Sequence, residues 1–335
     1  MLKYCELENP SFFEKYICIF LNKNNWNKVE PEYWFKDKNE NKHYKVKDLP
    51  VLKKIDYFHR SMTLSIIKNN IKSCSTHLTD RLNLYILCKK IMPKTYLIYG
   101  KLPDNFKIQE NKIYFLKENN KNYNTGITII NNTNSKNIEG FIDISKNYVL
   151  QHNVEKLLLY NNFKFHVRIY LLVNYENKYE YYIYNEGLLT LSKDKYDINN
   201  KQSLLSRDRK QNKLHYENYF SNYKYYNILF KNIKKYVTYL IKQFSKICKN
   251  PENKSYMLMG LDFIFNIKGI PFLLEINKGP VLGELNIIMI KELVDIVFNN
   301  KKNINFIKIR VKDKKYTLKN KKYKNKTKKY KNANK

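Results

Sequence analysis

The chain has few of the residues that break regular structure and few acidic side chains. Its 335 residues include only 8 Gly, 8 Pro and 5 Cys, and 30 acidic residues stand against 63 basic ones. The cysteines are widely spaced with no CxxC pair, which argues against a disulfide framework and a structural zinc site and favours a reducing compartment. No apolar run of about 18 residues occurs and the N-terminus has no apolar stretch, so neither a membrane span nor a signal peptide is predicted. We therefore expect a cytoplasmic protein without a membrane partner.

Positive charge is the most unusual property of the composition. The formal net charge is +33, and residues 312–335 hold 12 Lys against a single Asp without apolar periodicity. This predicts a basic, disordered C-terminal tail, which we begin at residue 301. The rest of the chain also remains strongly basic, so we expect acidic partners, among which nucleic acid, acidic protein tails and nucleotides all qualify.

Apolar residues are abundant enough to build a core, at 43% of the chain. Residues 1–54 are predicted to form an N-terminal lobe or extension, and residues 55–300 the main domain. Helical periodicity occurs at 64–91, 219–248 and 285–298. Strand patterns occur at 95–99, 113–117, 127–130, 149–151, 165–173, 181–184, 261–267 and 272–276. This mixture predicts an α+β enzyme core rather than an all-α binding module.

Residues 259–283 carry the clearest chemical pattern. They predict two antiparallel strands joined by a turn at 266–269, with Asp262 on the first strand and Glu275 and Asn277 at the end of the second. The i, i+2 spacing of Glu275 and Asn277 places both side chains on one face. Two carboxylates and an amide are oxygen ligands suited to Mg²⁺ that also binds nucleotide phosphates. The alternative is that the carboxylates are ordinary edge-strand residues, but an unpaired carboxylate beside a core is costly, which favours the metal.

Several blocks of the chain then match one known family in the same order. The segment LDFIFNIKGIPFLLEINKGP (261–280) resembles the GFDFxxDxxxxPWLLEVNxxP signature of the tubulin tyrosine ligase family, whose members resemble other ATP-grasp ligases, and the chain looks like a divergent member of it. The other blocks are MPKTYLI (92–98), YFLKENNKNYNTGITII (114–130), VLQHNVEKLLLYNNFKFHVRIYLLV (149–173) and YIYNEGLLTLSKDKY (182–196), each similar to a family block.

The resemblance implies a fold, a reaction and its cofactors. The fold would be of the ATP-grasp type, with nucleotide bound between two α+β subdomains beside a small N-terminal lobe. The reaction would be an ATP- and Mg²⁺-dependent ligation that joins a free amino acid (tyrosine, glutamate or glycine) to a protein. An acyl phosphate would be the intermediate, and the acceptor would be an acidic segment such as a tubulin C-terminal tail.

The resemblance also assigns roles to residues. Lys117 and Lys164 would contact ATP phosphates, as mobile point charges can. Arg168 would hold the transferred phosphate or the reacting carboxylate, and Lys291 would lie near the amino-acid substrate. The implied nucleotide-binding residues are Lys117, Gly126, Gln151, His152, Asn153, Val154 and Lys164; the metal ligands are Asp262, Glu275 and Asn277; the catalytic residues are Arg168, Lys164 and Glu275.

The chain departs from the family pattern at four points. His166 stands where the family has Asp, Asn185 stands where it has Arg, Gly126 is the single glycine of the phosphate loop, and the HLTN motif has no counterpart in 203–210. These departures support a second hypothesis, a protein that binds nucleotide or acidic tails without turnover. A third is a basic nucleic-acid-binding protein, although no recognised RNA or DNA module occurs and charge alone gives only nonspecific affinity.

Overall fold

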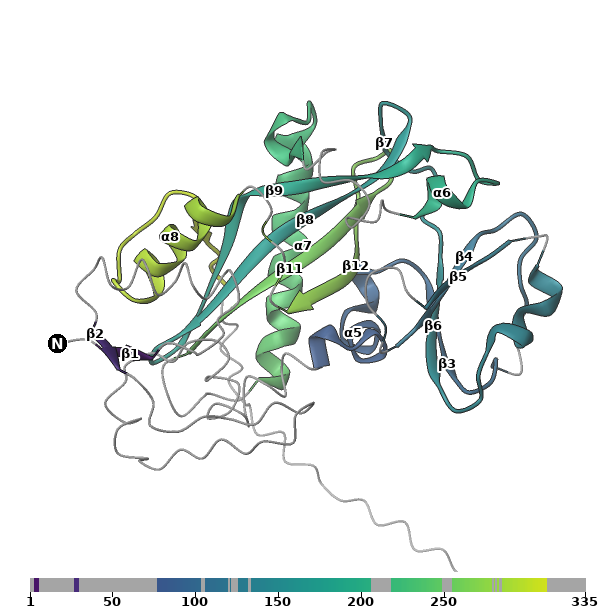
Figure 1. The fold of residues 1–335 in the computed structure, drawn as a ribbon, viewed down its shortest axis with the longest axis horizontal. Helices are drawn as coiled ribbons and strands as arrows, with labels where there is room; N and C mark the ends of the chain where they lie inside the picture. Colours follow the sequence, from purple (N-terminus) through teal and green to yellow (C-terminus); the bar gives the residue numbers. More distant parts are fainter. Residues whose placement is uncertain are drawn as a thin grey trace, which may run out of the picture.

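The computed structural model describes residues 3–5, 27–29, 77–103, 106–119, 121, 126–131, 134–205, 218–248, 255–278, 280, 282 and 285–311. Most of the predicted N-terminal lobe, the first of the two helices predicted in 64–91, and the tail from 312 lie outside these ranges. Within 1–54, β1 (Lys3–Cys5) and β2 (Asn27–Val29) pair in parallel. The rest of the described chain forms two antiparallel sheets with helices against them, so the predicted α+β class is confirmed (Figure 1).

The larger sheet has seven strands and contains the centre of the fold. Its order is β10 (Asn218–Tyr219), β9 (Tyr179–Lys195), β8 (Phe163–Tyr175), β11 (Ser255–Phe265) and β12 (Pro271–Lys278), with β13 (Phe306–Lys308) paired to β9 and β7 (Leu159–Tyr160) paired to β8. Every residue of β11 is buried. A strand that is covered on both faces loses the alternation of apolar and polar residues, which is why its sequence is an almost continuous apolar run.

The smaller sheet has four strands and lies beside the β12 edge of the larger one (Figure 1). Its order is β3 (Thr95–Tyr99), β6 (Asn147–His152), β4 (Tyr114–Glu118) and β5 (Ile127–Ile130). It has an apolar cluster of its own, centred on Tyr114, Leu116 and Leu150.

Helices cover both faces of the larger sheet. They are α5 (Arg81–Cys88), α6 (Lys201–Leu204), α7 (Tyr226–Ile247) and α8 (Asn286–Val297), with short 3₁₀ segments η1 (Lys89–Ile91), η2 (Ser135–Phe141) and η3 (Phe220–Asn222). The helix α7 buries Leu229, Ile233, Val237, Leu240 and Phe244, a helical spacing that forms a single apolar stripe. None of the helices in the described part of the chain is long and apolar enough to span a membrane.

The two faces of the larger sheet have different coverings. Val167 and Ile169 of β8 pack with α7 in the main core, whereas Tyr170 and Leu172 pack with α8 in a second cluster. Successive side chains of a strand point to opposite faces, so Arg168 lies on the same face as Tyr170 and Leu172, nearer the start of the strand. This face therefore changes from apolar under α8 to polar toward the smaller sheet.

A bulge in the β11–β12 hairpin determines which residues share that polar face. Asp262 pairs with Glu275 but Phe263 pairs with Leu273, so Leu274 is an extra residue on β12. A one-residue bulge lets two consecutive side chains point to the same side. As a result Leu274 packs with Ile264 in an apolar cluster while Glu275 lies next to it on the same face.

Two expectations from the sequence are corrected by the fold. The strand β13 pairs with β9, so the folded chain continues past residue 301, where we placed the start of the tail. Cys248, which ends α7, is disulfide-bonded, whereas Cys88 is a free, buried thiol. The spacing of cysteines along the sequence can indicate a multi-disulfide framework or a zinc site, but it does not predict a single disulfide between distant residues.

Gly187 of β9 is required by close backbone contact, and we expect Gly187→Ala to destabilise the fold. A Cβ there would lie 2.6 Å from the Arg168 carbonyl oxygen and 2.6 Å from Ile169 Cδ1. Overpacking of this kind costs about 1–3 kcal/mol, which urea unfolding would measure. Gly140→Ala is the matched control, because its Cβ would meet only the exposed Asn137 side chain, which can move away. Equal stability of the two variants would contradict this explanation.

Candidate active site

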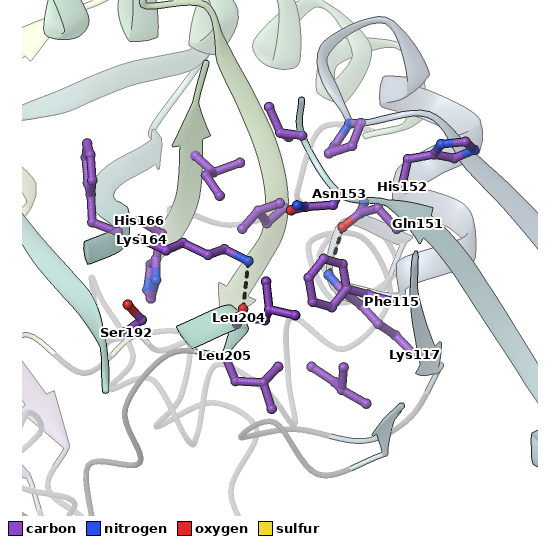
Figure 2. A pocket seen from close by; sticks show the side chains of 16 residues that line it. Phe115, Lys117, Gln151, His152, Asn153, Lys164, His166, Ser192, Leu204 and Leu205 are labelled. Atoms are coloured by element: carbon purple, nitrogen blue, oxygen red, sulfur yellow. Dashed lines mark hydrogen bonds between the residues drawn. The ribbon is translucent and has the colours of Figure 1, made fainter. Parts of the chain in front are cut away.

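A pocket lies between the two sheets. The empty space in it is about 600 Å³, a figure that includes open solvent at its mouth. Figure 2 shows Lys117 of the smaller sheet and Lys164 of the larger sheet entering it from opposite sides. The other lining residues are mainly apolar and are contributed by both sheets and by α6: Pro93, Phe115, Ile127, Gln151, His152, Asn153, Val154, Phe165, His166, Ser192, Leu204, Leu205, Ile264 and Leu274.

Lys117 is held by the buried amide of Gln151. Its Nζ donates to Gln151 Oε1 at 2.8 Å, and Gln151 is only 2% exposed. Burial, opposed by the attraction of Glu275 and reinforced by the charge of Arg81, lowers the pKa of Lys117 from 10.5 to about 8. The lysine is therefore a cation with a neutral partner, which an anionic ligand would bind more strongly.

Lys164 is the second cation of the pocket. Its Nζ donates to the Leu204 carbonyl at 2.7 Å and lies 4.5 Å from the centre of the Phe115 ring. Burial, and then repulsion from Lys117, lower the pKa of Lys164 to about 7. Two ammonium groups that repel each other across an apolar pocket favour a ligand that combines negative charge with a flat apolar part.

A polar cluster adjoins the pocket on the same face of the larger sheet. Arg168 donates to both carboxylate oxygens of Asp262, from Nε at 2.8 Å and from Nη2 at 2.6 Å. Asn277 Nδ2 donates to Asp262 Oδ2 at 3.0 Å and to Glu275 Oε1 at 3.2 Å. Both Asp262 and Glu275 act on the Lys117 pKa, so the cluster and the pocket form one electrostatic unit.

The donor set of this cluster fits a hard divalent cation. Glu275 is 38% exposed at its side chain and accepts from Asn277, so an oxygen ligand is accessible there. Rotation of the Asn277 amide would present its oxygen, and Asp262 would contribute once Arg168 is drawn to another anion. Among the described residues no three His, Cys, Asp or Glu side chains gather as a metal site, so the fit depends on an amide as third ligand.

Comparison with known proteins identifies the family of the chain. The profile of the tubulin-tyrosine ligase family matches residues 44–315. The chain belongs to the tubulin-tyrosine ligase family. It is 26% identical over 166 residues to the Mus musculus protein Tubulin polyglutamylase TTLL5. This match covers 48% of this chain and 12% of that protein. It is 26% identical over 199 residues to Tubulin glycylase 3A of Drosophila melanogaster, covering 51% of this chain and 20% of that protein. The matches thus span only a small part of these relatives.

The structure brings together most residues that the family resemblance singled out. Lys117, Lys164 and the segment 151–154 line the pocket, and Arg168 lies in the polar cluster with Asp262, Glu275 and Asn277. Gly126 does not line the pocket; it has a φ of +71° and accepts a backbone hydrogen bond from Glu118, so it shapes the β4–β5 connection. Lys291 is also absent from the lining and lies on the exposed side of α8.

His152 lies at the edge of the pocket, and its ring is uncharged. Burial, and then the charges of Lys94 and Lys112, lower its pKa to about 4. The ring packs 4.4 Å from Tyr114, centre to centre, and its buried Nε2 has no hydrogen-bond partner within the described part of the chain. Its imidazole therefore packs beside Tyr114 and points away from the pocket (Figure 2).

Two of the four departures from the family pattern, His166 and Asn185, lie in different places. His166 lines the pocket, where the family carboxylate would stand. Asn185 does not: its Nδ2 donates to Asn305 Oδ1 at 3.1 Å and its backbone N–H to the Asn305 carbonyl, which ties β9 to the segment before β13. Of these two substitutions only the one at 166 alters the pocket, which Leu204 and Leu205 of the segment without an HLTN counterpart also line.

Three groups of the site were missed by sequence reasoning. Leu204 and Leu205 close the pocket from α6, and Arg81 of α5 contacts Glu275. Arg81 carried a signal that could have been used, since an arginine at the start of a helix faces the positive end of the helix dipole and therefore needs a specific partner.

Proposed function

We propose that this chain is an ATP-dependent carboxylate–amine ligase that joins an amino acid to an acidic protein acceptor. The observation that supports the proposal most directly is that two half-buried lysines, from two different sheets, face one pocket directly beside a carboxylate–amide–arginine cluster. Nucleotide phosphates would bind the lysines, and the apolar lining would hold the base.

The residues of the chain would divide the reaction between them. Lys117 and Lys164 would bind the phosphates and stabilise charge that develops on the transferred phosphoryl group. A carboxylate oxygen would attack the γ-phosphorus as ADP leaves, and Arg168 would hold that carboxylate or the phosphoryl oxygens. An amine would then attack the acyl carbon as phosphate leaves and the nitrogen loses a proton, which leaves an amide bond.

Asp262, Glu275 and Asn277 would hold Mg²⁺, which supplies Lewis-acid neutralisation of phosphate charge when bound. The chain itself must first release Asp262 from Arg168. A phosphate or carboxylate near Arg168 offers an alternative anion for the same two donors, so ligand binding and the freeing of Asp262 would be coupled.

The acceptor is proposed from charge and from relatives. A net charge of +33 favours an acidic protein segment, and two relatives carry names that refer to tubulin polyglutamylation and glycylation. A tubulin C-terminal tail is therefore the acceptor to test first, with glutamate, glycine and tyrosine as the amino acids.

A second candidate is a nucleotide-binding protein without turnover. His166 favours it, because a neutral or cationic imidazole cannot act as the carboxylate that the family has at this place. The two candidates share the pocket and differ only in whether ADP is released.

Glu275→Gln tests the proposed site, and we expect it to weaken ATP binding in Mg²⁺ at least roughly tenfold while changing binding in EDTA little. The reason is that the substitution removes a metal ligand and leaves the pocket lysines in place. Calorimetry would measure both affinities. The control is Glu155→Gln, an exposed carboxylate that pairs with Lys112 away from the pocket lining.

Turnover is then measured in the same protein with tubulin and the three amino acids. ADP release that requires both acceptor and amino acid would support the ligase. Binding without release would support the second candidate. Failure of the native protein to bind ATP with or without Mg²⁺ would reject both.

A further inference from the structure

Arg81 is a buried cation at an unfavourable position for its charge. It is the first residue of α5, whose N-cap Asp80 accepts from the Asn83 N–H at 2.8 Å, and its side chain is only 9% exposed. The unpaired N–H groups of a helix start repel a cation, and burial removes its hydration. Other groups must therefore offset the unfavourable energy of the Arg81 charge at this position.

Its two partners belong to the two halves of the candidate active site. Arg81 Nη1 donates to the carbonyl of Glu118, the residue after Lys117 on β4. Arg81 Nη2 lies 3.8 Å from Glu275 Oε2 on β12. One guanidinium thus contacts the strand that carries a pocket lysine and the strand that carries a proposed metal ligand.

Further hydrogen bonds fix the end of β4 to the same turn of helix. Asn119 Nδ2 donates to Asp80 Oδ2 at 2.5 Å, and the Leu82 N–H donates to Asn119 Oδ1 at 3.3 Å. The other side of α5 is anchored in the main core through Leu84 and Cys88, and Leu78, which precedes the helix, joins the same core with residues of α7 and the larger sheet. The helix α5 therefore connects the smaller sheet rigidly to the larger one.

Glu275 is held from two sides by this arrangement. Its Oε1 accepts from Asn277, and its Oε2 faces Arg81 at a distance longer than a hydrogen bond. The Glu275 carboxylate is therefore oriented, but Arg81 does not bind it with two short hydrogen bonds as Arg168 binds Asp262. It stays available to a further cation.

We infer that Arg81 is a positioning residue, which sets Lys117 and Glu275 at the separation that one phosphate-bearing ligand requires. This role rests on the proposed nucleotide site. Arg81 acts through Lys117 on the smaller sheet and through Glu275 on the larger, and it does not act through Lys164, whose contacts are with Leu204 and Phe115.

The test is a set of double variants read by ATP affinity in Mg²⁺. We expect Arg81→Met to weaken ATP binding about tenfold, to add little further loss in a Lys117→Met background, and to show its full loss in a Lys164→Met background. A residue that only stabilises the fold would add the same loss to both backgrounds, and that result would overturn the inference. Arg310→Met, at an exposed arginine, is the control and should leave ATP affinity unchanged.

A second readout needs no nucleotide and separates this inference from the proposed function. NMR titration of the lysine side chains should show the Lys117 pKa rising in Arg81→Met, with the Lys164 pKa unchanged. If the native protein fails to bind ATP but this selective shift occurs, the proposed function fails while Arg81 is still shown to act on Lys117. An unchanged Lys117 pKa would overturn the inference.

Arg81→Lys serves if the Met variant does not fold. A single ammonium keeps the charge but cannot contact Glu118 and Glu275 with two separate nitrogens, as the guanidinium does. We expect a loss of ATP affinity of several-fold, again absent in the Lys117→Met background. Native affinity in Arg81→Lys would show that charge alone suffices and would overturn the positioning role.

Discussion

Asp262→Ala should lower the free energy of unfolding by about 3–5 kcal/mol, the largest effect that we expect from any single substitution in the site. The side chains of Arg168 and Asp262 are 12% and 5% exposed, and two hydrogen bonds join them. Burial alone lowers the pKa of Arg168, but the Asp262 carboxylate raises it above its ordinary value. Without that carboxylate a guanidinium would be left buried and charged. Urea unfolding followed by circular dichroism would measure the loss.

The double variant Arg168→Met/Asp262→Leu distinguishes the cost of an unpaired charge from the loss of a contact. Replacing a whole buried pair by apolar residues is often close to neutral, so the double variant should regain most of the stability. Glu155→Ala, which removes an exposed partner of Lys112, should change stability by less than about 1 kcal/mol. If the double variant is as unstable as Asp262→Ala, the unpaired charge is not the cause.

ATP affinity should increase by roughly 50-fold or more when the pH falls from 9 to 7, provided that the phosphates bind Lys164. Lys164 has a pKa of about 7 and Lys117 of about 8 in the free protein, so both are largely neutral at pH 9. A bound phosphate favours the charged forms, so binding takes up protons. Calorimetry in buffers of different ionisation enthalpy would count them.

Lys164 should also make folding stability depend on pH, in the direction opposite to ATP affinity: stability should rise as the pH rises. Because the pKa of Lys164 is lowered on folding from 10.5 to about 7, the unfolded chain binds more protons between these values. Its contribution to stability therefore rises with pH through this window, and the cost is fully present below pH 7. Lys164→Met should stabilise the free protein by ~1 kcal/mol or more at pH 7 and remove most of the pH dependence of binding. Affinity that does not change with pH would contradict the placement of this lysine.

The hairpin β11–β12 could be predicted from the sequence because its information is local. The turn at 266–269, the position of Asp262 and the shared face of Glu275 and Asn277 all follow from alternation and a short connection. The bulge at Leu274 could not be predicted, since the sequence around it is evenly apolar and the extra residue is defined only by pairing.

Contacts between distant segments were the part that sequence could not supply. Arg81 and Glu118 are 37 positions apart, and Lys164 and Leu204 are 40 apart. The first contact joins α5 to the smaller sheet and the second joins the larger sheet to α6, so their geometry depends on how helices and sheets pack. Lys117 and Lys164 were assigned through family motifs, because in so basic a chain periodicity alone does not distinguish a pocket lysine from a surface one.

Element boundaries were wrong where turn residues interrupt a longer element. The strand predicted at 181–184 is part of β9, which continues to Lys195 because an irregularity opposite Ile169 accommodates the change of register. The helix predicted from 219 begins at Tyr226, since 218–219 pair with β9 and 220–222 form η3.

The bulge at Leu274 has a consequence for how the chain finds its fold. If β12 paired with β11 without the extra residue, every side chain beyond it would change faces. Glu275 and Asn277 would then point into the apolar layer under α7, and Ile276 would take their place on the polar face. Burial of an isolated carboxylate is so unfavourable that this alternative pairing is excluded. Glu275, proposed to bind the metal, thus also disfavours the shifted register of its own hairpin. Selection for metal binding would therefore preserve the correct strand pairing, and selection for the pairing would preserve the metal ligand.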